Sequence, residues 1–182
     1  TRLDLLTSQY DTSYEYFSQR LEGLADDEYF WEPASTSWSI RRRAEARTPR
    51  IFGKGDWVLE MEIPEPATPL VTTIAWRLGH MISGEMIRHD YTFGNKSLHW
   101  DQIEFAGSAS EALAMLERSH QAWRAGLGSL SDADLDIVGL SSNPWGLDPT
   151  LPFGDILWWT NRELIHHAAE IALLRDLWRF QA

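Results

Sequence analysis

The chain has 182 residues, a formal net charge of −11 at pH 7 and no cysteine. This length suits one domain with a sizeable core, so we expect a single domain over residues 1–182. The missing cysteines exclude disulfides, cysteine-ligated metals and a cysteine nucleophile. The acidic balance argues against nucleic acid and an anionic membrane as partners.

The first part of the chain is predicted to hold one long helix and one short strand. Apolar residues spaced three and four apart indicate an amphipathic helix over 3–24. Residues 26–50 look irregular. A two-residue alternation over 51–63 favours a strand or hairpin arm, with Gly53-Lys54-Gly55 as its turn.

Three further helices are expected, separated by long loops. One runs over about 70–89, with Thr68 before it and Pro69 at its first position. Another runs over about 109–127 and ends at glycines. The last, over about 154–179, is apolar nearly all round, which predicts a position inside a bundle.

These elements predict an all-α fold, a four-helix bundle with long connecting loops and a small β-hairpin insertion near 51–63. Loops of this length are typical of the rim of a site, and the 10 tryptophans favour an aromatic core or cavity. No apolar run is long enough for a membrane span, and the N-terminal residues lack a signal-peptide pattern. We therefore expect a cytoplasmic protein.

Polar residues on apolar helices indicate a metal site. Glu163 and His167 are four residues apart on one face of the last helix, where an uncompensated carboxylate costs several kcal/mol. A metal ion would compensate the charge and keep the imidazole neutral. His80, on a mostly apolar face of the second helix, is the candidate third ligand. Two histidines and one glutamate leave coordination positions open, as catalytic metals require.

The same residues also have simpler interpretations. Glu163 and His167 could form only a hydrogen-bonded pair, and His80 could be a core histidine. His166 lies about 100° around the helix from His167, so it is assigned to packing or to support of the site. The remaining histidines lack partners at ligand spacing and are assigned to the surface or loops: His89, His99 and His120. The run Arg41-Arg42-Arg43 is either an anion-binding patch or a solvated basic turn.

Three segments resemble the DinB-like superfamily. The tail 161–177 is similar to the last helix of that family, and 74–81 is similar to its second helix with a single ligand histidine. Leu24-Ala25-Asp26-Asp27-Glu28, with the later Pro33 and Trp38-Ser39-Ile40, matches the pattern before that helix. Residues 41–70 look like an insertion relative to this pattern.

The resemblance implies a four-helix bundle that holds a divalent metal, commonly zinc or nickel, through three residues. Many members use three histidines, the last two in an H-x3-H arrangement. Here Glu163 and His167 occupy the matching positions, which is similar to the branch with mycothiol-dependent maleylpyruvate isomerase, whose ligands are His, Glu and His. The resemblance therefore assigns the metal to His80, Glu163 and His167.

This analogy favours a metal-dependent transferase or isomerase that uses a low-molecular-weight thiol, such as mycothiol or bacillithiol, as cosubstrate. The substrate would be a small molecule, and an arginine would hold its acidic groups: Arg41, Arg42 or Arg88. Glu170, one turn beyond His167, is a candidate to orient a ligand or to act as a base. The alternatives are a metal-hydroxide hydrolase, or a non-catalytic small-molecule-binding or stress-related protein. A homodimer is a further expectation for such a bundle.

Overall fold

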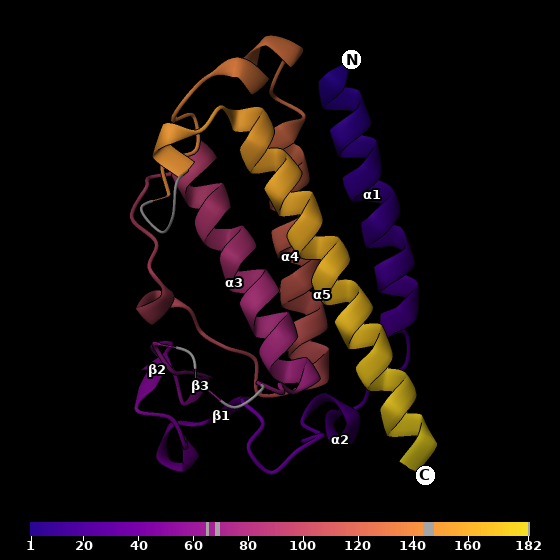
Figure 1. The fold of residues 1–182 in the computed structure, drawn as a ribbon. Helices are drawn as coiled ribbons and strands as arrows, with labels where there is room; N and C mark the ends of the chain where they lie inside the picture. The colour runs from indigo at the N-terminus through magenta and orange to yellow at the C-terminus, as the bar shows by residue number, and fades with distance from the viewer. Residues whose placement is uncertain (65, 68–69, 144–147, 182) are drawn as a thin grey trace.

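The computed structural model describes residues 1–64, 66–67, 70–143 and 148–181. Four long helices lie side by side, and a small sheet and a short helix lie near one end of them (Figure 1). The long helices are α1 (Arg2–Leu21), α3 (Ile74–Phe93), α4 (Ala109–Leu127) and α5 (Phe153–Gln181). The predicted all-α four-helix bundle is confirmed.

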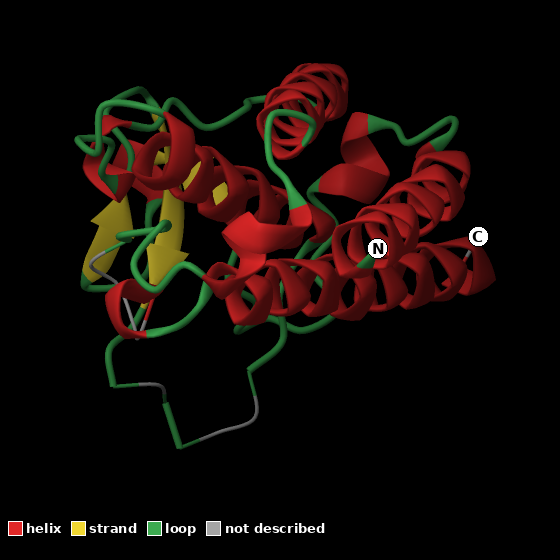
Figure 2. Cartoon of the chain, turned by 90° about the horizontal axis from the view of Figure 1, so that it is seen from above, coloured by secondary structure: helices red, strands yellow, loops and turns green. Residues whose placement is uncertain are grey.

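The shorter elements all belong to the connections between these helices. They are α2 (Asp26–Tyr29), β1 (Ile40–Arg42), β2 (Arg50–Phe52) and β3 (Trp57–Met61), with single 3-10 turns along the loops. Seen from above, the strands lie on the side of the molecule opposite both chain ends (Figure 2). The strands and the short helix all belong to the connection between α1 and α3.

Side-chain caps explain where the long helices begin. Thr1 and Asp4 form a capping box at the start of α1. Thr73 caps α3 and Ser108 caps α4, each by accepting a hydrogen bond from a backbone N–H three residues on. The helix that was expected over about 109–127 therefore begins at Ala109, directly after its cap Ser108.

The second predicted helix is displaced toward the C-terminus. The cap of α3 is Thr73, whereas the expected cap Thr68 and the following Pro69 lie outside the described residues. At its other end α3 continues to Phe93, so His89 lies on a helix and not in a loop. The helix therefore has the expected length of 20 residues but begins and ends about one turn later than predicted.

The insertion forms a three-stranded antiparallel sheet and not the single hairpin arm predicted over 51–63. The strand order is β1-β3-β2, so β3 pairs on both sides. Gly53-Lys54-Gly55 lies in the turn between β2 and β3, as expected. The third strand, β1, comes from the segment 26–50 that was expected to be irregular. A three-residue strand is too short to show a period of its own.

The predicted alternation along β3 is wrong because Val58, Leu59 and Glu60 are all buried. The buried carboxylate of Glu60 accepts hydrogen bonds from the side chain of Arg41 (2.9 Å) and the backbone N–H of Arg47 (2.6 Å). Its charge is thereby satisfied inside the fold, which allows a polar residue at a buried position.

Arg41 is part of an internal ion network rather than an anion-binding patch or a solvated turn. Its side chain is 11% exposed and also pairs with Glu32 (2.8 Å), which Arg47 contacts from the other side (2.7 Å). Arg42 lies over the indole of Trp57, with 4.9 Å from the guanidinium carbon to the ring centroid. Arg43 donates to the backbone carbonyls of Gly53 (2.6 Å) and Gly55 (3.0 Å), so all three arginines of this run have partners within the insertion.

Two glycines of α3 have different surroundings. A Cβ atom at Gly79 would lie 2.6 Å from the Cδ1 atom of Ile40 and 3.3 Å from a methyl carbon of Leu59, so the glycine lets the sheet pack closely on α3. A Cβ atom at Gly84 would meet nothing within 4 Å, so this position borders open space.

The last helix does not lie inside the bundle, contrary to the prediction. α5 packs on α1 and α3 but leaves one side to solvent, and its exposed residues include Trp158 (56%), Leu173 (60%) and Phe180 (92%). The nearly uniform apolar composition therefore reflects an exposed apolar face as well as a buried one.

The expected homodimer stays a prediction. Among the described residues, no helix combines the length and the apolar character that crossing a membrane requires.

Candidate metal centre

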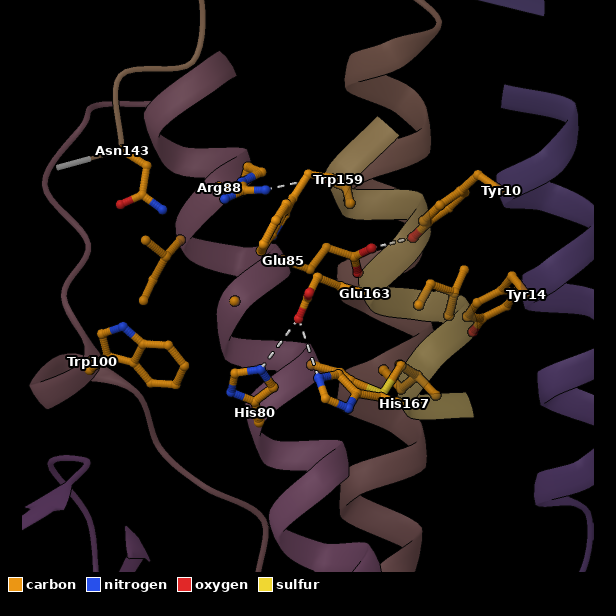
Figure 3. Close-up of a pocket in the computed structure, with 16 residues that line it drawn as sticks. Tyr10, Tyr14, His80, Glu85, Arg88, Trp100, Asn143, Trp159, Glu163 and His167 are labelled. Carbon is orange, nitrogen blue, oxygen red and sulfur yellow. Dashed lines mark hydrogen bonds and ion pairs between the residues drawn. The ribbon is translucent and has the colours of Figure 1, made fainter. Parts of the chain in front are cut away.

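The three predicted metal ligands converge at one point between α3 and α5 (Figure 3). His80 comes from α3, and Glu163 and His167 come from successive turns of α5. The Oε2 atom of Glu163 lies 3.3 Å from Nε2 of His167 and 3.8 Å from Nε2 of His80. The spacing of Glu163 and His167 places both on one face of α5, and the packing of α3 against α5 adds His80.

These distances suit a bound cation. Ligand atoms about 2.1 Å from a tetrahedral zinc ion lie roughly 3.4 Å from one another. The ligand atoms of His80, Glu163 and His167 all lie within 4.8 Å of one another. The separation of 3.8 Å between His80 and Glu163 is too long for a hydrogen bond, so the two side chains face each other without being bonded directly.

The electrostatics of the cluster also favour the protonation states that a metal needs. The imidazole of His167, and secondarily that of His80, holds the pKa of Glu163 well below its usual range. Burial lowers the pKa of His80, which keeps its imidazole neutral. One carboxylate and neutral imidazole nitrogen atoms are the donor set that zinc and nickel accept.

Glu170 holds His167 from the side opposite Glu163. Its Oε2 atom lies 2.7 Å from Nδ1 of His167 and 3.2 Å from Nε of Arg77. A hydrogen bond at Nδ1 leaves Nε2 of His167 free to bind a cation, an arrangement common around metal-bound histidines. Two roles were predicted for Glu170. Orienting a ligand agrees with this geometry. The role of a base does not, because Glu170 is not among the residues that line the pocket beside the cluster.

A second group of possible ligands lies on α5 alone. His166, His167 and Glu170 also place ligand atoms within 4.8 Å of one another. The side chain of His166 is 52% exposed, and the guanidinium of Arg77 already neutralises Glu170. The group formed with His80 draws on two helices and contains no half-exposed histidine, so it is the better candidate for a metal.

The imidazole of His80 is held between two indoles. Its ring centroid lies 5.1 Å from that of Trp76, with the planes 6° apart, and 6.0 Å from that of Trp100. The Nε1–H group of Trp76 donates a hydrogen bond to the backbone carbonyl of Glu60 in β3 (2.7 Å). The insertion, whose role was open at the level of sequence, thus fixes the ring of a ligand residue.

A pocket with a cavity volume of about 210 Å³ lies directly above the cluster. Its wall is largely apolar and aromatic, and polar groups enter it from α1, α3, α5 and the loop before α5. The lining residues apart from the three ligands are Tyr10, Tyr14, Met81, Gly84, Glu85, Ile87, Arg88, Trp100, Leu116, Asn143, Trp159, Thr160 and Leu164. This combination is typical of a small-molecule site.

Of the three arginines considered for an acidic substrate group, Arg88 is the one that lines the pocket. Its side chain is 13% exposed and pairs with Asp148 (3.1 Å) and Thr160 (3.2 Å). Its Nε atom is buried and has no hydrogen-bond partner within the described part of the chain. The guanidinium group therefore retains a donor.

Several pocket residues were not recognised in the sequence. Tyr10 and Glu85 belong to this group, because isolated polar residues in an amphipathic helix carry no spacing signal of their own. His120 was assigned to the surface or a loop, but it lies half-buried on α4 and stacks on the ring of Tyr14, with 3.4 Å between centroids. His99 precedes a 3-10 turn in a loop, as expected.

Comparison with known proteins agrees with this architecture. A family model described as the DinB superfamily matches residues 9–171, a range that includes all three ligand residues and spans the bundle from α1 into α5. Searches of curated proteins and of solved structures found no match. Because the family model covers most of the chain, the protein belongs to the DinB superfamily.

Proposed function

We propose that this protein is a divalent-metal-dependent enzyme that joins a low-molecular-weight thiol to a small electrophile, or uses the thiol to isomerise it. The observation that carries the proposal is the convergence of His80, Glu163 and His167 on one point at the base of an open pocket. Three protein ligands leave coordination positions for a reactant, which structural sites with four protein ligands do not.

Zinc or nickel is the proposed ion. A divalent cation held by these residues would lower the pKa of a thiol or water that enters the pocket, and so supply a nucleophile at neutral pH. The chain has no cysteine, so sulfur must come from a cosubstrate such as mycothiol or bacillithiol. We place the reaction in the cytoplasm, where such thiols are kept reduced.

The residues of the chain hold the reactants. Glu170 and the two indoles beside His80 fix the directions of the ligand nitrogens. The apolar walls exclude water and accept the hydrocarbon part of an electrophile. The free Nε–H group of Arg88 offers a hydrogen bond to a carboxylate of the thiol or the substrate.

Hydrolysis is the second candidate function. It needs a general base near the attacking water, and Glu170 lies on the far side of His167. Apart from the ligand Glu163, the carboxylate that lines the pocket is Glu85. Its position there favours hydrolysis, because it could serve as the general base. A thiol and water would compete for the same ion, so a binding measurement separates the two functions.

Metal content per chain tests the site. The protein without a histidine tag should hold about one zinc or nickel ion, and His80→Ala and His167→Ala should lose it. His166→Ala is the matched control, because it removes an imidazole from the adjacent position of α5. Metal loss in His166→Ala with retention in His80→Ala would move the site to the exposed group of α5. No metal in any sample would leave a small-molecule-binding protein.

Thiol binding tests the reaction class. The cobalt-substituted protein should develop a sulfur-to-cobalt charge-transfer band when mycothiol or bacillithiol is added. Free serine, added in place of the thiol compound, should produce no such band. A cobalt protein whose spectrum does not respond to either thiol would contradict thiol chemistry and favour hydrolysis.

A further inference from the structure

A second polar group faces the pocket from α3, about one turn before Arg88 (Figure 3). Glu85 of α3 accepts a hydrogen bond from the hydroxyl of Tyr10 of α1. The same hydroxyl lies 3.3 Å from Nδ1 of His120 on α4. Three helices thus contribute one continuous chain of polar atoms that begins in the pocket.

Glu85 lacks a compensating cation. None of the described residues forms an ion pair with its carboxylate, although the salt bridges of Glu163 and Arg88 lie in the same pocket. Burial raises the pKa of Glu85, and the hydroxyls of Tyr10 and Ser119 oppose that effect. A carboxyl group in such surroundings is able to hold a proton at a pH where an exposed one has lost it.

The titratable groups around Glu85 come from every long helix of the bundle. Those that share the pocket with it are Tyr10 and Tyr14 of α1, His80 and Arg88 of α3, and Glu163 and His167 of α5. From α4, His120 reaches Tyr10 and stacks on the ring of Tyr14. Among the described residues, the titratable group that forms a hydrogen bond with Glu85 is Tyr10.

His120 is suited to be the outer end of this chain. Its ring is stacked with Tyr14 (3.4 Å between centroids) and with Tyr10 (5.4 Å), which holds Nδ1 toward the Tyr10 hydroxyl. Burial lowers the pKa of His120, so the imidazole is neutral and able to accept a proton. The residue is only half-buried and remains in contact with solvent.

We propose that Glu85 takes the proton from the nucleophile that enters the pocket, and that Tyr10 and His120 carry this proton to the surface. The inference rests on the proposed function, because it assigns a route to the proton that a thiol must lose. The walls of the pocket are largely apolar, and Tyr10 and His120 offer polar atoms along which the proton can move to the surface.

The proton balance of the route is closed. In this route Glu85 starts as a neutral carboxyl group. It gives its proton to the Tyr10 oxygen while the Tyr10 hydroxyl proton moves to Nδ1 of His120, and the imidazolium loses one proton to water. The carboxylate of Glu85 then takes the S–H proton of the thiol and is neutral again, so the net products are a thiolate in the pocket and one proton in solution.

The first experiment needs neither metal nor thiol. Infrared difference spectra of the metal-free wild type against Glu85→Gln, at pH 7, should contain the carbonyl band of a protonated carboxyl group. Tyr10→Phe should shift this band, because the group loses its hydrogen-bond partner. Glu15→Gln, which changes an exposed carboxyl of α1 in the same way, should leave the band in place.

The second experiment follows the proton itself. Mycothiol is mixed with the metal-loaded protein in weak buffer, and a pH indicator records the released proton in a stopped-flow instrument. Glu85→Gln should slow the release about 10²-fold with metal content unchanged, the lower range for a positioned acid–base group. His120→Ala should also slow it, and added imidazole should restore the rate, which a purely structural role would not produce.

The two measurements separate this inference from the proposed function. A wild type without a protonated-carboxyl band at pH 7 would overturn the role of Glu85, whatever the metal does. Release that is as fast in Glu85→Gln as in the wild type would overturn it as well. A metal-loaded protein that binds no mycothiol would instead contradict the proposed function, and the infrared result would still decide the state of Glu85.

Discussion

Two polar clusters on α5 differ in how completely the protein satisfies them. Arg175 donates to both carboxylate oxygens of Glu28, at 2.7 and 2.9 Å, and to the backbone carbonyls of Arg20 and Glu22. The side chains of this pair are 2% and 6% exposed. Arg175 therefore ties α5 to the end of α1 and to α2, and each of its three nitrogen atoms donates a hydrogen bond.

The metal-ligand cluster, only two turns earlier on the same helix, is left open. The side chains of His80 and Glu163 are 29% and 32% exposed, and 3.8 Å separates their facing atoms. Nδ1 of His80 is buried without a partner within the described residues. A closed cluster fastens helices to one another, whereas an open one beside a pocket keeps ligand atoms available. The following predictions test this distinction, from the largest effect to the smallest.

Replacement of Arg175 should cause the largest loss of stability. Arg175→Met leaves Glu28 as an uncompensated buried charge, and breaking a buried pair typically costs about 3–5 kcal/mol. Urea unfolding at pH 7 measures the change. Arg179→Met, which alters an exposed arginine four residues later, should stay within about 0.5 kcal/mol of the wild type. A loss below about 1 kcal/mol in Arg175→Met would remove the distinction between the clusters.

Metal should stabilise the protein through the open cluster. At a free concentration 1,000 times the dissociation constant, zinc should add about 4 kcal/mol to the free energy of unfolding. His80→Ala should abolish this gain, while its metal-free form should lose less stability than Arg175→Met does. Denaturant titrations with zinc and with a chelator give both values. An equal gain in His80→Ala would show that zinc binds elsewhere.

Glu170→Gln should weaken metal binding without removing a ligand. The amide no longer stabilises the ring of His167 as a carboxylate does, and loss of such support typically lowers metal affinity about 10–100-fold. Competition with a chromophoric chelator measures the affinity. His166→Ala should bind zinc as the wild type does. Unchanged affinity in Glu170→Gln would mean that the contact to Nδ1 of His167 is only structural.

The pH dependence of the metal-free protein should carry the smallest effect. Because the folded pKa of Glu163 lies below its unfolded value of about 4.3, its ionised form contributes stability above that pH and loses it as the pH falls through the folded value. Stability should therefore decrease less steeply in Glu163→Gln than in the wild type below about pH 4.5. Urea unfolding between neutral pH and pH 3 gives the slopes, and equal slopes would contradict the pKa direction.

Local sequence patterns predicted the long helices and the paired ligands on α5. Periodicity over four turns or more is a strong signal, and Glu163 with His167 share a face by spacing alone. The position of His80 opposite them depends on how α3 packs on α5, so the residues could supply only a candidate. The start of α3 was missed because its cap, Thr73, follows a proline-rich segment that offered other caps.

Tertiary contacts decided what the local patterns could not. The sheet depends on pairing between residues up to 19 positions apart and on the ion network of Arg41, neither of which leaves a short-range signal. Likewise, the partners of Tyr10 lie 75 and 110 positions away, on two other helices. The exposed apolar face of α5 was read as interior because composition does not reveal which side of a helix a neighbour covers.

Gly84 gives the pocket a position where its size is adjustable. Most core residues of the bundle touch neighbours on all sides, so a larger side chain there disturbs the packing. At Gly84 an added methyl group would enter the pocket and contact no other atom of the protein within 4 Å. Alanine there would also favour the helix by about 1 kcal/mol. A single substitution at this residue would therefore change which molecules fit the pocket without lowering the stability of the bundle.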